Sequence, residues 1–269
     1  MPTHRLSWAA HSLKQRLGSS RPALAGATLA LSAALAAGTA AAVPALMAGP
    51  AHAATRDAAN PAGNGADHDW KAGSARAATT YGQDVSGYEA DHDWKASPAQ
   101  FGIIKATEGL DFVDPAFARH WAELAKKGIV RGVYHYGHPS NDPVEEADYF
   151  LSVVNRQPAR PGDLLVLDLE TTDGESVQHV NAWAKTWLAH VKEKTGVTPM
   201  FYSGWNFADR YGHGLGQYPL WVAYYGIPKG SVTPPADWKT WVIHQYTDTP
   251  IDQNVSSLTP DQLRALGRH

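Results

Sequence analysis

Two acidic residues stand two positions apart at the end of an apolar segment. This segment, Leu164–Glu170, reads L-L-V-L-D-L-E and follows the turn-like sequence R-P-G-D. An uninterrupted apolar run predicts a strand buried on both faces, as in a parallel sheet. Side chains alternate across a strand, so Asp168 and Glu170 point to the same side with their Cα atoms about 6.6 Å apart. At that separation each charge raises the proton affinity of the other group, which favours acid and base catalysis.

Other polar and aromatic residues stand where further strands are expected to end. In a parallel barrel the loops at the carboxyl ends of the strands form the active site. Acids beside tyrosine and tryptophan suit a sugar, because aromatic faces stack on pyranose rings while carboxylates bind hydroxyl groups and transfer protons. The candidates are Asp84, Lys105, Glu108, Tyr134, Tyr136, His138, Asp168, Glu170, Tyr202, Trp221 or Tyr224, Gln245 and Asp252. Three other tryptophans, Trp121, Trp183 and Trp187, are expected in the core.

Strands alternate with helices over the region that must position these residues. We expect strands at 79–86, 101–105, 129–136, 164–170, 200–203, 220–224 and 241–246, with a short closing piece near 251–255. Helices are expected at 114–128, 141–156 and 176–194, and a brief one at 206–211. This alternation predicts a parallel barrel or a doubly wound sheet. Because the later links are short and rich in glycine and proline, we favour a single irregular α/β barrel of the TIM type, with helices mainly in its first half.

The first 53 residues predict a secretory signal peptide. They contain four basic residues and no acid, and an Ala/Leu-rich run leads to A-H-A at 51–53. This order is typical of an exported protein that is cleaved after Ala53. An uncleaved membrane anchor is the alternative, although Gly38, Pro44 and the many alanines weaken a spanning helix. We expect residues 54–80 to form a flexible linker and residues 81–269 to form one folded domain of a secreted protein.

Composition excludes several classes of function. Removal of the four basic residues with the signal changes the formal charge from −3 to −7, which disfavours a nucleic-acid partner. The chain has no cysteine, so thiol catalysis and cysteine-ligated zinc are excluded. Glycine-rich phosphate loops are absent, which disfavours nucleotide binding. We expect no cofactor, no metal, no stable association with a membrane after cleavage, and a monomer.

One heptapeptide, A-D-H-D-W-K-A, occurs at 66–72 and again at 90–96. A single pair is too little for a repeat architecture, which needs several stacked units. A local duplication without function is the simplest explanation. The alternative is that the first copy occupies the place of the second before maturation. The Asp-x-Asp pattern with a histidine is compatible with a metal site, but an exposed polar turn is favoured.

The order of the motifs over residues 81 to about 257 resembles the family 25 glycoside hydrolases, the secreted bacterial and phage muramidases sometimes called Chalaropsis-type lysozymes. The matching pieces are G-Q-D-V-S, F-G-I-I-K-A-T-E-G, G-V-Y-H-Y-G-H-P, V-L-D-L-E, F-Y-S-G, L-W-V-A-Y-Y and H-Q-Y followed by D-Q-N. The resemblance implies an enzyme that cleaves the β-1,4 bond between N-acetylmuramic acid and N-acetylglucosamine in bacterial peptidoglycan.

The same resemblance implies roles for single residues. Glu170 matches the general acid, and Asp168 matches the partner that stabilises positive charge or orients the acetamido group. Two outer acids, Asp84 and Asp252, complete the catalytic set, although a purely structural role for them stays open. The implied substrate-binding residues are Tyr134, Tyr136, Tyr202, Trp221, Tyr224 and Gln245. His138 fits loop structure better than a base.

Two departures from the family pattern put fine specificity in doubt. Glu89 stands where glutamine is frequent, and Ser256 stands where an aromatic residue commonly follows D-x-N. Two other functions stay open as well. A peptidoglycan-binding barrel without catalysis would keep the aromatic residues but lose an acid, and no acid is lost. A metal-dependent hydrolase using His135 and His138 requires convergent ligands, whereas these two lie on different faces or loops.

Overall fold

The computed structural model describes residues 80–269. The predicted signal peptide, residues 54–79 of the predicted linker and the first heptapeptide lie outside the described residues. The strands are β1 (Thr80–Val85), β2 (Phe101–Glu108), β3 (Phe112–Val113), β4 (Val130–Tyr136), β5 (Leu164–Asp168), β6 (Met200–Gly204), β7 (Leu220–Ala223), β8 (Ile243–Thr247) and β9 (Gln253–Ser256). The helices are η1 (Gly87–Glu89), α2 (Phe117–Lys127), α3 (Pro143–Val154), α4 (Val177–Thr195), α5 (Trp205–Tyr211) and α6 (Pro260–Arg264).

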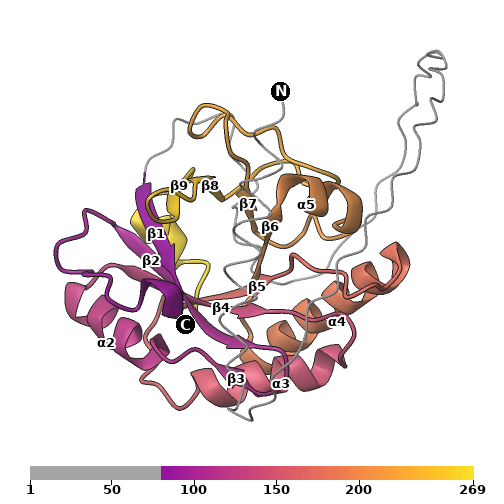
Figure 1. Cartoon of the computed structure of the whole chain (residues 1–269), viewed down its shortest axis with the longest axis horizontal. Helices are drawn as coiled ribbons and strands as arrows, with labels where there is room; N and C mark the ends of the chain where they lie inside the picture. Colours follow the sequence, from indigo (N-terminus) through magenta and orange to yellow (C-terminus); the bar gives the residue numbers. More distant parts are fainter. Residues whose placement is uncertain (1–79) are drawn as a thin grey trace, which may run out of the picture. The chain divides into compact units, whose positions relative to one another are not determined.

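Eight of these strands close into a barrel (Figure 1). Their order around the barrel is β1, β2, β4, β5, β6, β7, β8 and β9, and β9 pairs again with β1. Neighbouring strands are parallel except at β9, which is antiparallel to both β8 and β1. The strand β3 folds back on β2 as a short hairpin. The predicted irregular barrel is confirmed, with one antiparallel strand that the sequence did not indicate.

Local sequence signals begin and end the main helices. The Asp142 side chain accepts hydrogen bonds from the first turn of α3, and Pro143 takes the position where its missing N–H costs nothing. At the carboxyl ends of α2 and α4, Gly128 and Gly196 adopt the left-handed conformation, with φ of 75° and 72°. Glycine has no Cβ to oppose that conformation, so it ends a helix readily.

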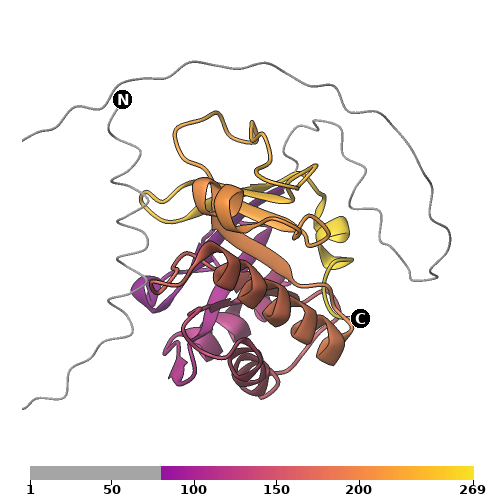
Figure 2. The same cartoon turned by 90° about the vertical axis from the view of Figure 1, so that its right-hand side faces the viewer.

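Helices cover the barrel unevenly. Figures 1 and 2 show α2, α3 and α4 packed along one side, whereas the later strands are joined mostly by loops and the short α5. The predicted concentration of helices in the first half is therefore confirmed. The helices bury three tryptophans on their inner faces, as expected. Trp121 of α2 is 2% exposed, and Trp183 and Trp187 of α4 are 3% and 0% exposed. None of the helices within residues 80–269 is both long and apolar enough to cross a membrane.

Strand alternation produces two apolar layers. On β5 and just after it, Leu165, Leu167 and Leu169 belong to the layer between the sheet and the helices. Val166 belongs to a second layer, inside the barrel. Because Asp168 has the same parity as Val166, it also faces the interior. The alternation predicted for this segment is thus present from Leu164 to Asp168, where β5 ends, and Glu170 lies two residues beyond the strand.

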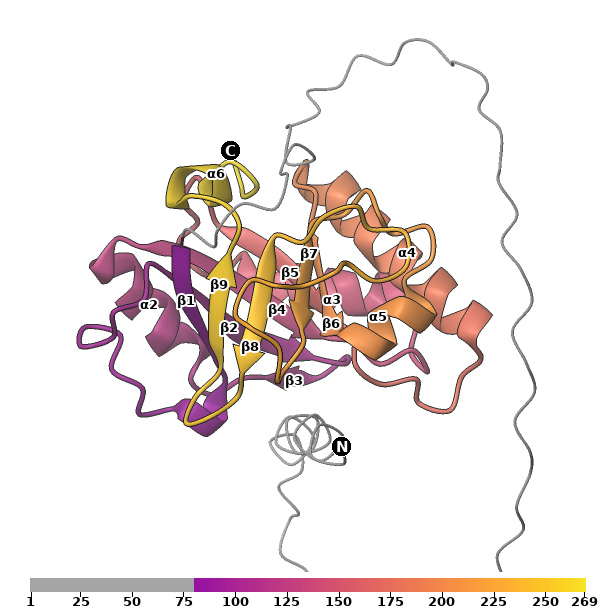
Figure 3. The same cartoon turned by 90° about the horizontal axis from the view of Figure 1, so that it is seen from above.

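The two ends of the barrel differ. Figure 3 shows α6 at one end and the β3 hairpin at the other. At the α6 end, Arg264 donates a hydrogen bond to the carbonyl of Gly128, just before β4 begins. The carboxyl ends of the parallel strands therefore open at the β3 end, where the candidate residues gather.

The second heptapeptide is a turn with a buried anchor. Asp91, Asp93 and Lys95 are exposed, in agreement with a polar turn, but Trp94 is 1% exposed. The Trp94 indole donates a hydrogen bond to His120 of α2 at 2.9 Å. This contact assigns the copy at 90–96 a structural role.

We predict that Trp187→Ala lowers the free energy of unfolding by about 3–5 kcal/mol, because it empties a large site that the surrounding residues fill only in part. The Trp187 ring stacks on the His135 ring, with 5.6 Å between the ring centroids. Its centroid lies 5.5 Å from that of the Phe150 ring. Urea unfolding would measure the change. The exposed Glu193 on the same helix is the control, since Glu193→Ala is expected to change stability by no more than about 0.5 kcal/mol. Equal stability of the two variants would contradict the packing described here.

Candidate functional site

The two central acids lie at the carboxyl end of β5. Asp168 is 2% exposed and Glu170 is 4% exposed. The backbone here is held from both sides: the amide of Gly137 donates to the Asp168 carbonyl at 2.9 Å, and the amide of Leu169 donates to the Tyr202 carbonyl at 3.1 Å. Strand pairing places Asp168 between Tyr136 of β4 and Tyr202 of β6.

Asp84, the acid of β1, is held by two side-chain amides. Gln245 of β8 donates from Nε2 to both carboxylate oxygens, at 3.1 and 3.0 Å. Asn254 of β9 donates from Nδ2 to Oδ2 at 2.6 Å. Asp84 is 3% exposed, and a buried carboxylate is stable only when donors of this kind surround it. The three residues come from three consecutive strands around the barrel.

Two tyrosines complete this network. Tyr202 donates its hydroxyl to Oε1 of Gln245 at 3.0 Å, and Tyr225 donates to the same oxygen. Burial raises the pKa of both hydroxyls well above the ordinary value, and the negative charge of Glu170 raises each pKa further. The carboxylates of Asp84 and Asp168 add to this effect at Tyr202, and those of Asp252 and Asp84 add to it at Tyr225. Both tyrosines therefore stay neutral and act as hydrogen-bond donors.

Most of the predicted binding residues are inside the barrel. Tyr134, Tyr136, Tyr202, Trp221 and Gln245 are at most 2% exposed. The Trp221 indole donates to Oδ1 of Asn254 at 2.8 Å, which links it to Asp84. These side chains shape the floor and walls of the barrel mouth.

Tyr224 differs from the other predicted binding residues because it points outward. Its side chain is 37% exposed and stacks on Trp205 at 5.5 Å between ring centroids. Trp205 is itself held by a hydrogen bond from its indole to the carbonyl of Thr233 at 2.8 Å. An exposed, stacked aromatic pair of this kind offers a face to a pyranose ring.

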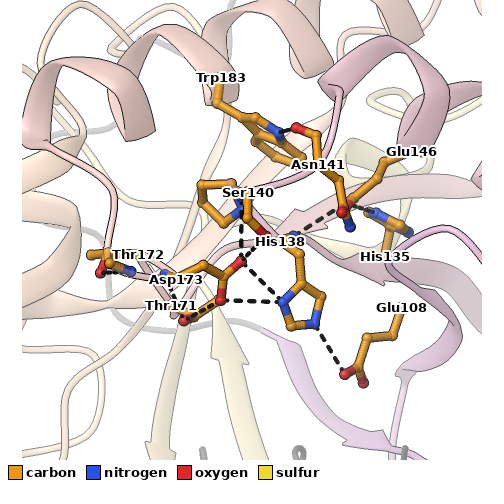
Figure 4. Close-up of polar contacts among 12 residues, drawn as sticks. Glu108, His135, His138, Ser140, Asn141, Glu146, Thr171, Thr172, Asp173 and Trp183 are labelled. Atoms are coloured by element: carbon orange, nitrogen blue, oxygen red, sulfur yellow. Dashed lines mark hydrogen bonds and ion pairs between the residues drawn. The ribbon is translucent and has the colours of Figure 1, made fainter.

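Four side chains of alternating charge form a chain near the mouth, and Figure 4 shows three of them, Glu108, His138 and Asp173. Lys105 contacts Glu108 at 2.5 Å, and the second oxygen of Glu108 contacts His138 Nε2 at 3.2 Å. His138 Nδ1 contacts Asp173 Oδ2 at 3.1 Å. We call these four residues the ion chain. It ties β2, the loop after β4 and the loop after β5 together, and Asp173 is only three residues beyond Glu170.

The ion chain holds its groups charged. Burial alone would lower the pKa of His138, but its contacts with Asp173 and Glu108 raise that pKa to about 9. Burial alone would raise the pKa values of Asp173 and Glu108, but hydrogen bonds and charge from His138, with Lys105 also acting on Glu108, lower both. Asp173 keeps a φ of 50°, an uncommon conformation for a residue other than glycine, and Thr171 donates a hydrogen bond to it at 2.9 Å.

The two histidines of the metal hypothesis do not converge. His135 is fully buried on the helix side of the sheet, where its Nε2 contacts Glu146 of α3 at 2.7 Å and its Nδ1 contacts Thr107 at 2.8 Å. His138 belongs to the ion chain. Among residues 80–269, no three histidine, cysteine, aspartate or glutamate side chains are arranged to hold a metal ion.

The remaining predicted positions have local roles. Asp252 is half-buried in the loop before β9 and acts electrostatically on Tyr225. Glu89 completes a capping box at η1, because its carboxylate accepts from the amide of Ser86 at 3.2 Å. Ser256 is buried and donates to the carbonyl of Val242 at 2.9 Å. Glu89 therefore stabilises backbone just after β1, whereas Ser256 stabilises backbone at the opposite end of the barrel, where it pairs with Thr80 and Ile243.

Sequence reasoning missed four residues of this region. Tyr225 and Asn254 carry part of the network around Asp84, Trp205 stacks on Tyr224, and Asp173 ends the ion chain. A signal for Tyr225 existed, since strand alternation counted from Trp221 places 225 on the inner face and 224 on the outer. The T-T-D-G turn directly after Glu170 was the signal for Asp173.

Comparison with known proteins adds an independent line of support. The family model described as "Glycosyl hydrolases family 25" matches residues 83–255. "Uncharacterized protein YegX" of Escherichia coli strain K12 is 35% identical over 177 residues, which make up 62% of this chain and 62% of that protein. "Lysozyme M1" of Streptomyces globisporus is 31% identical over 166 residues, or 55% of this chain and 54% of that protein. The chain thus spans less than two thirds of these curated relatives.

A solved structure has the same fold. The family GH25 lysozyme from Aspergillus fumigatus superimposes with a TM-score of 0.64 at 28% identity, and the match covers 71% of this chain and 99% of that chain.

We predict that the ion chain makes folding stability fall at alkaline pH. His138 has a folded-state pKa of about 9, above the ordinary value of about 6.5 expected after unfolding. Its contribution is therefore fully present below about pH 6.5 and is lost as the pH rises through about 9. Urea unfolding from pH 6 to 10 should give a steeper decline for the wild-type protein than for His138→Gln. His190, which contacts Asp148 at 2.7 Å on the helical side, provides the control. His190→Gln should keep the wild-type slope, and equal slopes in all three proteins would contradict the prediction.

Proposed function

Because this chain belongs to glycosyl hydrolases family 25, we propose that it is a lysozyme that cleaves the β-1,4 bond between N-acetylmuramic acid and N-acetylglucosamine in peptidoglycan. The observation that carries this proposal is the pair of buried acids at the end of β5, in a barrel mouth that also contains Asp84 and Asp252. The names of relatives such as Lysozyme M1 support it.

In this proposal Glu170 is the general acid. It donates a proton to the glycosidic oxygen while the bond to the anomeric carbon breaks. Asp168, the last residue of β5, stabilises the positive charge that develops on the sugar ring or orients the acetamido group. Such assistance is effective because the site is shielded from water. Charges interact more strongly in a shielded site than they do in water.

The surrounding residues have supporting roles in the same proposal. Asp84, fixed by Gln245 and Asn254, adds a negative charge whose position does not change during the reaction. Asp252 lies closer to solvent and is suited to contact substrate or water. Tyr202 and Tyr225 remain protonated and donate hydrogen bonds. The stacked pair of Tyr224 and Trp205 is suited to bind a sugar ring farther along the glycan.

We predict that Glu170→Gln lowers the rate of cell-wall hydrolysis by about 10²–10⁴-fold, because the amide has the shape of the acid but no proton to donate. Release of reducing ends from purified cell walls would measure the rate, and identification of the new reducing sugar as muramic acid would establish which bond is cut. The exposed Glu175 is the control, since Glu175→Gln should keep full activity.

Three results of this experiment would contradict the proposal in different ways. Full activity of Glu170→Gln would remove the general-acid role. Loss of wild-type activity in EDTA would favour a metal-dependent hydrolase. Binding of cell walls without release of reducing ends would favour a non-catalytic peptidoglycan-binding barrel.

We also propose that the protein is exported and cleaved after Ala53. The basic, apolar and A-H-A regions in this order support cleavage at that point. Amino-terminal sequencing of the protein recovered outside cells that express the full chain should begin at Ala54. Recovery of the uncleaved chain in the membrane fraction would instead support an amino-terminal anchor.

A further inference from the structure

A small pocket opens beside the predicted acids, between the end of β1 and the β3 hairpin. Its volume is about 110 Å³, and its walls are Ser86, Gly87, Tyr88, Lys105, Phe112, Asp114 and Pro115. Sites that enclose a whole drug-sized ligand are roughly 300–1,000 Å³, so this pocket has room for a substituent and not for a disaccharide. Of the candidate residues named from the sequence, only Lys105 lines it.

One exposed apolar side chain lines this pocket, and two more lie on the adjoining hairpin outside it. Tyr88 forms one wall and is 43% exposed. On the adjoining hairpin, Leu110 and Val113 are 39% and 42% exposed. The only other exposed large apolar side chain among residues 80–269 is Tyr224. A cluster of exposed apolar side chains at a concave site is typical of ligand binding.

The Lys105 side chain lies between a wall of this pocket and Tyr136 of β4. The Lys105 ammonium lies 5.4 Å from the centre of the Phe112 ring in the pocket wall. It lies 5.2 Å from the centre of the Tyr136 ring. Tyr136 is paired with Asp168 in the register of β4 and β5. The Lys105 side chain therefore connects the pocket wall to the strand neighbour of Asp168.

The pocket is rigid before any ligand arrives. Lys105 is 3% exposed and is fixed by Glu108 of the ion chain. Asp114 accepts hydrogen bonds from the amides of Gly87 at 2.7 Å and Ala116 at 2.8 Å, which fixes the wall at η1. A site that is already ordered loses little entropy on binding, so a small contact area still gives useful affinity.

We propose that this pocket binds the lactyl-peptide substituent of N-acetylmuramic acid, so that the enzyme prefers peptide-bearing glycan to bare glycan. This inference rests on the proposed lysozyme function. The apolar walls of Tyr88, Phe112 and Pro115 match the methyl groups of the lactyl unit and of a first alanine. The Lys105 ammonium matches a carbonyl or carboxylate oxygen of the peptide.

Position distinguishes this substituent from the acetamido group. The acetamido group occurs on both sugars of the polymer and is proposed to lie at Asp168, within the barrel mouth. The lactyl peptide occurs only on muramic acid and continues away from the glycan. A pocket at the rim with the exposed wall of Tyr88 permits that continuation into solvent.

We predict that the wild-type protein binds N-acetylmuramoyl-L-alanyl-D-isoglutamine about tenfold more tightly than N-acetylmuramic acid, because one or two apolar groups in a fitted pocket contribute about this factor. Calorimetric titration would measure both ligands. Phe112→Ala and Tyr88→Ala should abolish the preference. Val113 is the matched control, since it is the other residue of β3, faces the opposite side and does not line the pocket. Val113→Ala should keep the wild-type preference.

Hydrolysis separates this inference from the proposed function. On peptide-bearing strands Phe112→Ala should lower kcat/KM by about tenfold, whereas on strands stripped of peptide by an amidase it should change kcat/KM by less than about twofold. Equal losses on both substrates, or no preference for the dipeptide in the wild-type protein, would overturn the pocket assignment. A wild-type protein that hydrolyses neither substrate but prefers the dipeptide would overturn the lysozyme function and support the pocket. Tyr88→Ala, at an exposed position, keeps the test decisive if Phe112→Ala does not fold.

Discussion

The buried carboxylate of Asp84 is the constraint on which both the barrel and its site depend. A charge removed from water must be surrounded by donors, and loss of one donor costs more than a typical hydrogen bond contributes. The donors of Asp84 belong to Gln245 on β8 and Asn254 on β9, the two strands that close the barrel against β1. Closure of the barrel through β9 and fixation of the inner acid therefore use the same strands, β8, β9 and β1.

The mouth places Asp168 and Glu170 between two kinds of polar support. On one side, the neutral donors Tyr202 and Tyr225 connect to Asp84 through Gln245. On the other side, the ion chain alternates positive and negative groups from Lys105 to Asp173. Neutral donors stabilise negative charge without altering the net charge of the site, and the four charges of the ion chain also sum to zero. The acids on β5 can thus change their protonation during a reaction while their surroundings stay fixed.

Periodic features could be predicted from the sequence, and long-range pairings could not. Capping residues and glycines placed α2, α3 and α4, and the apolar run placed β5 with Asp168 at its end and Glu170 just beyond it. The direction of β9 depends on pairing with β1 across about 170 residues, which leaves no local pattern. The network around Asp84 depends on the same pairing. Tyr225, which the alternation of β7 places on the inner face, was not among the predicted residues, whereas Tyr224 was predicted and lies on the outer face.

Packing on the outside of the barrel also sets the chemistry inside it. The Trp94 ring lies against Gly102 of β2, where an added Cβ would come within 2.6 Å of the tryptophan and of Leu124. Only glycine permits this contact, which presses β2 against α2. Three residues further along the same strand, Lys105 faces inward and forms the wall shared by the ion chain and the pocket. Because successive side chains of a strand point to opposite sides, a tryptophan that fixes the outer face of β2 also fixes the position of the lysine on its inner face.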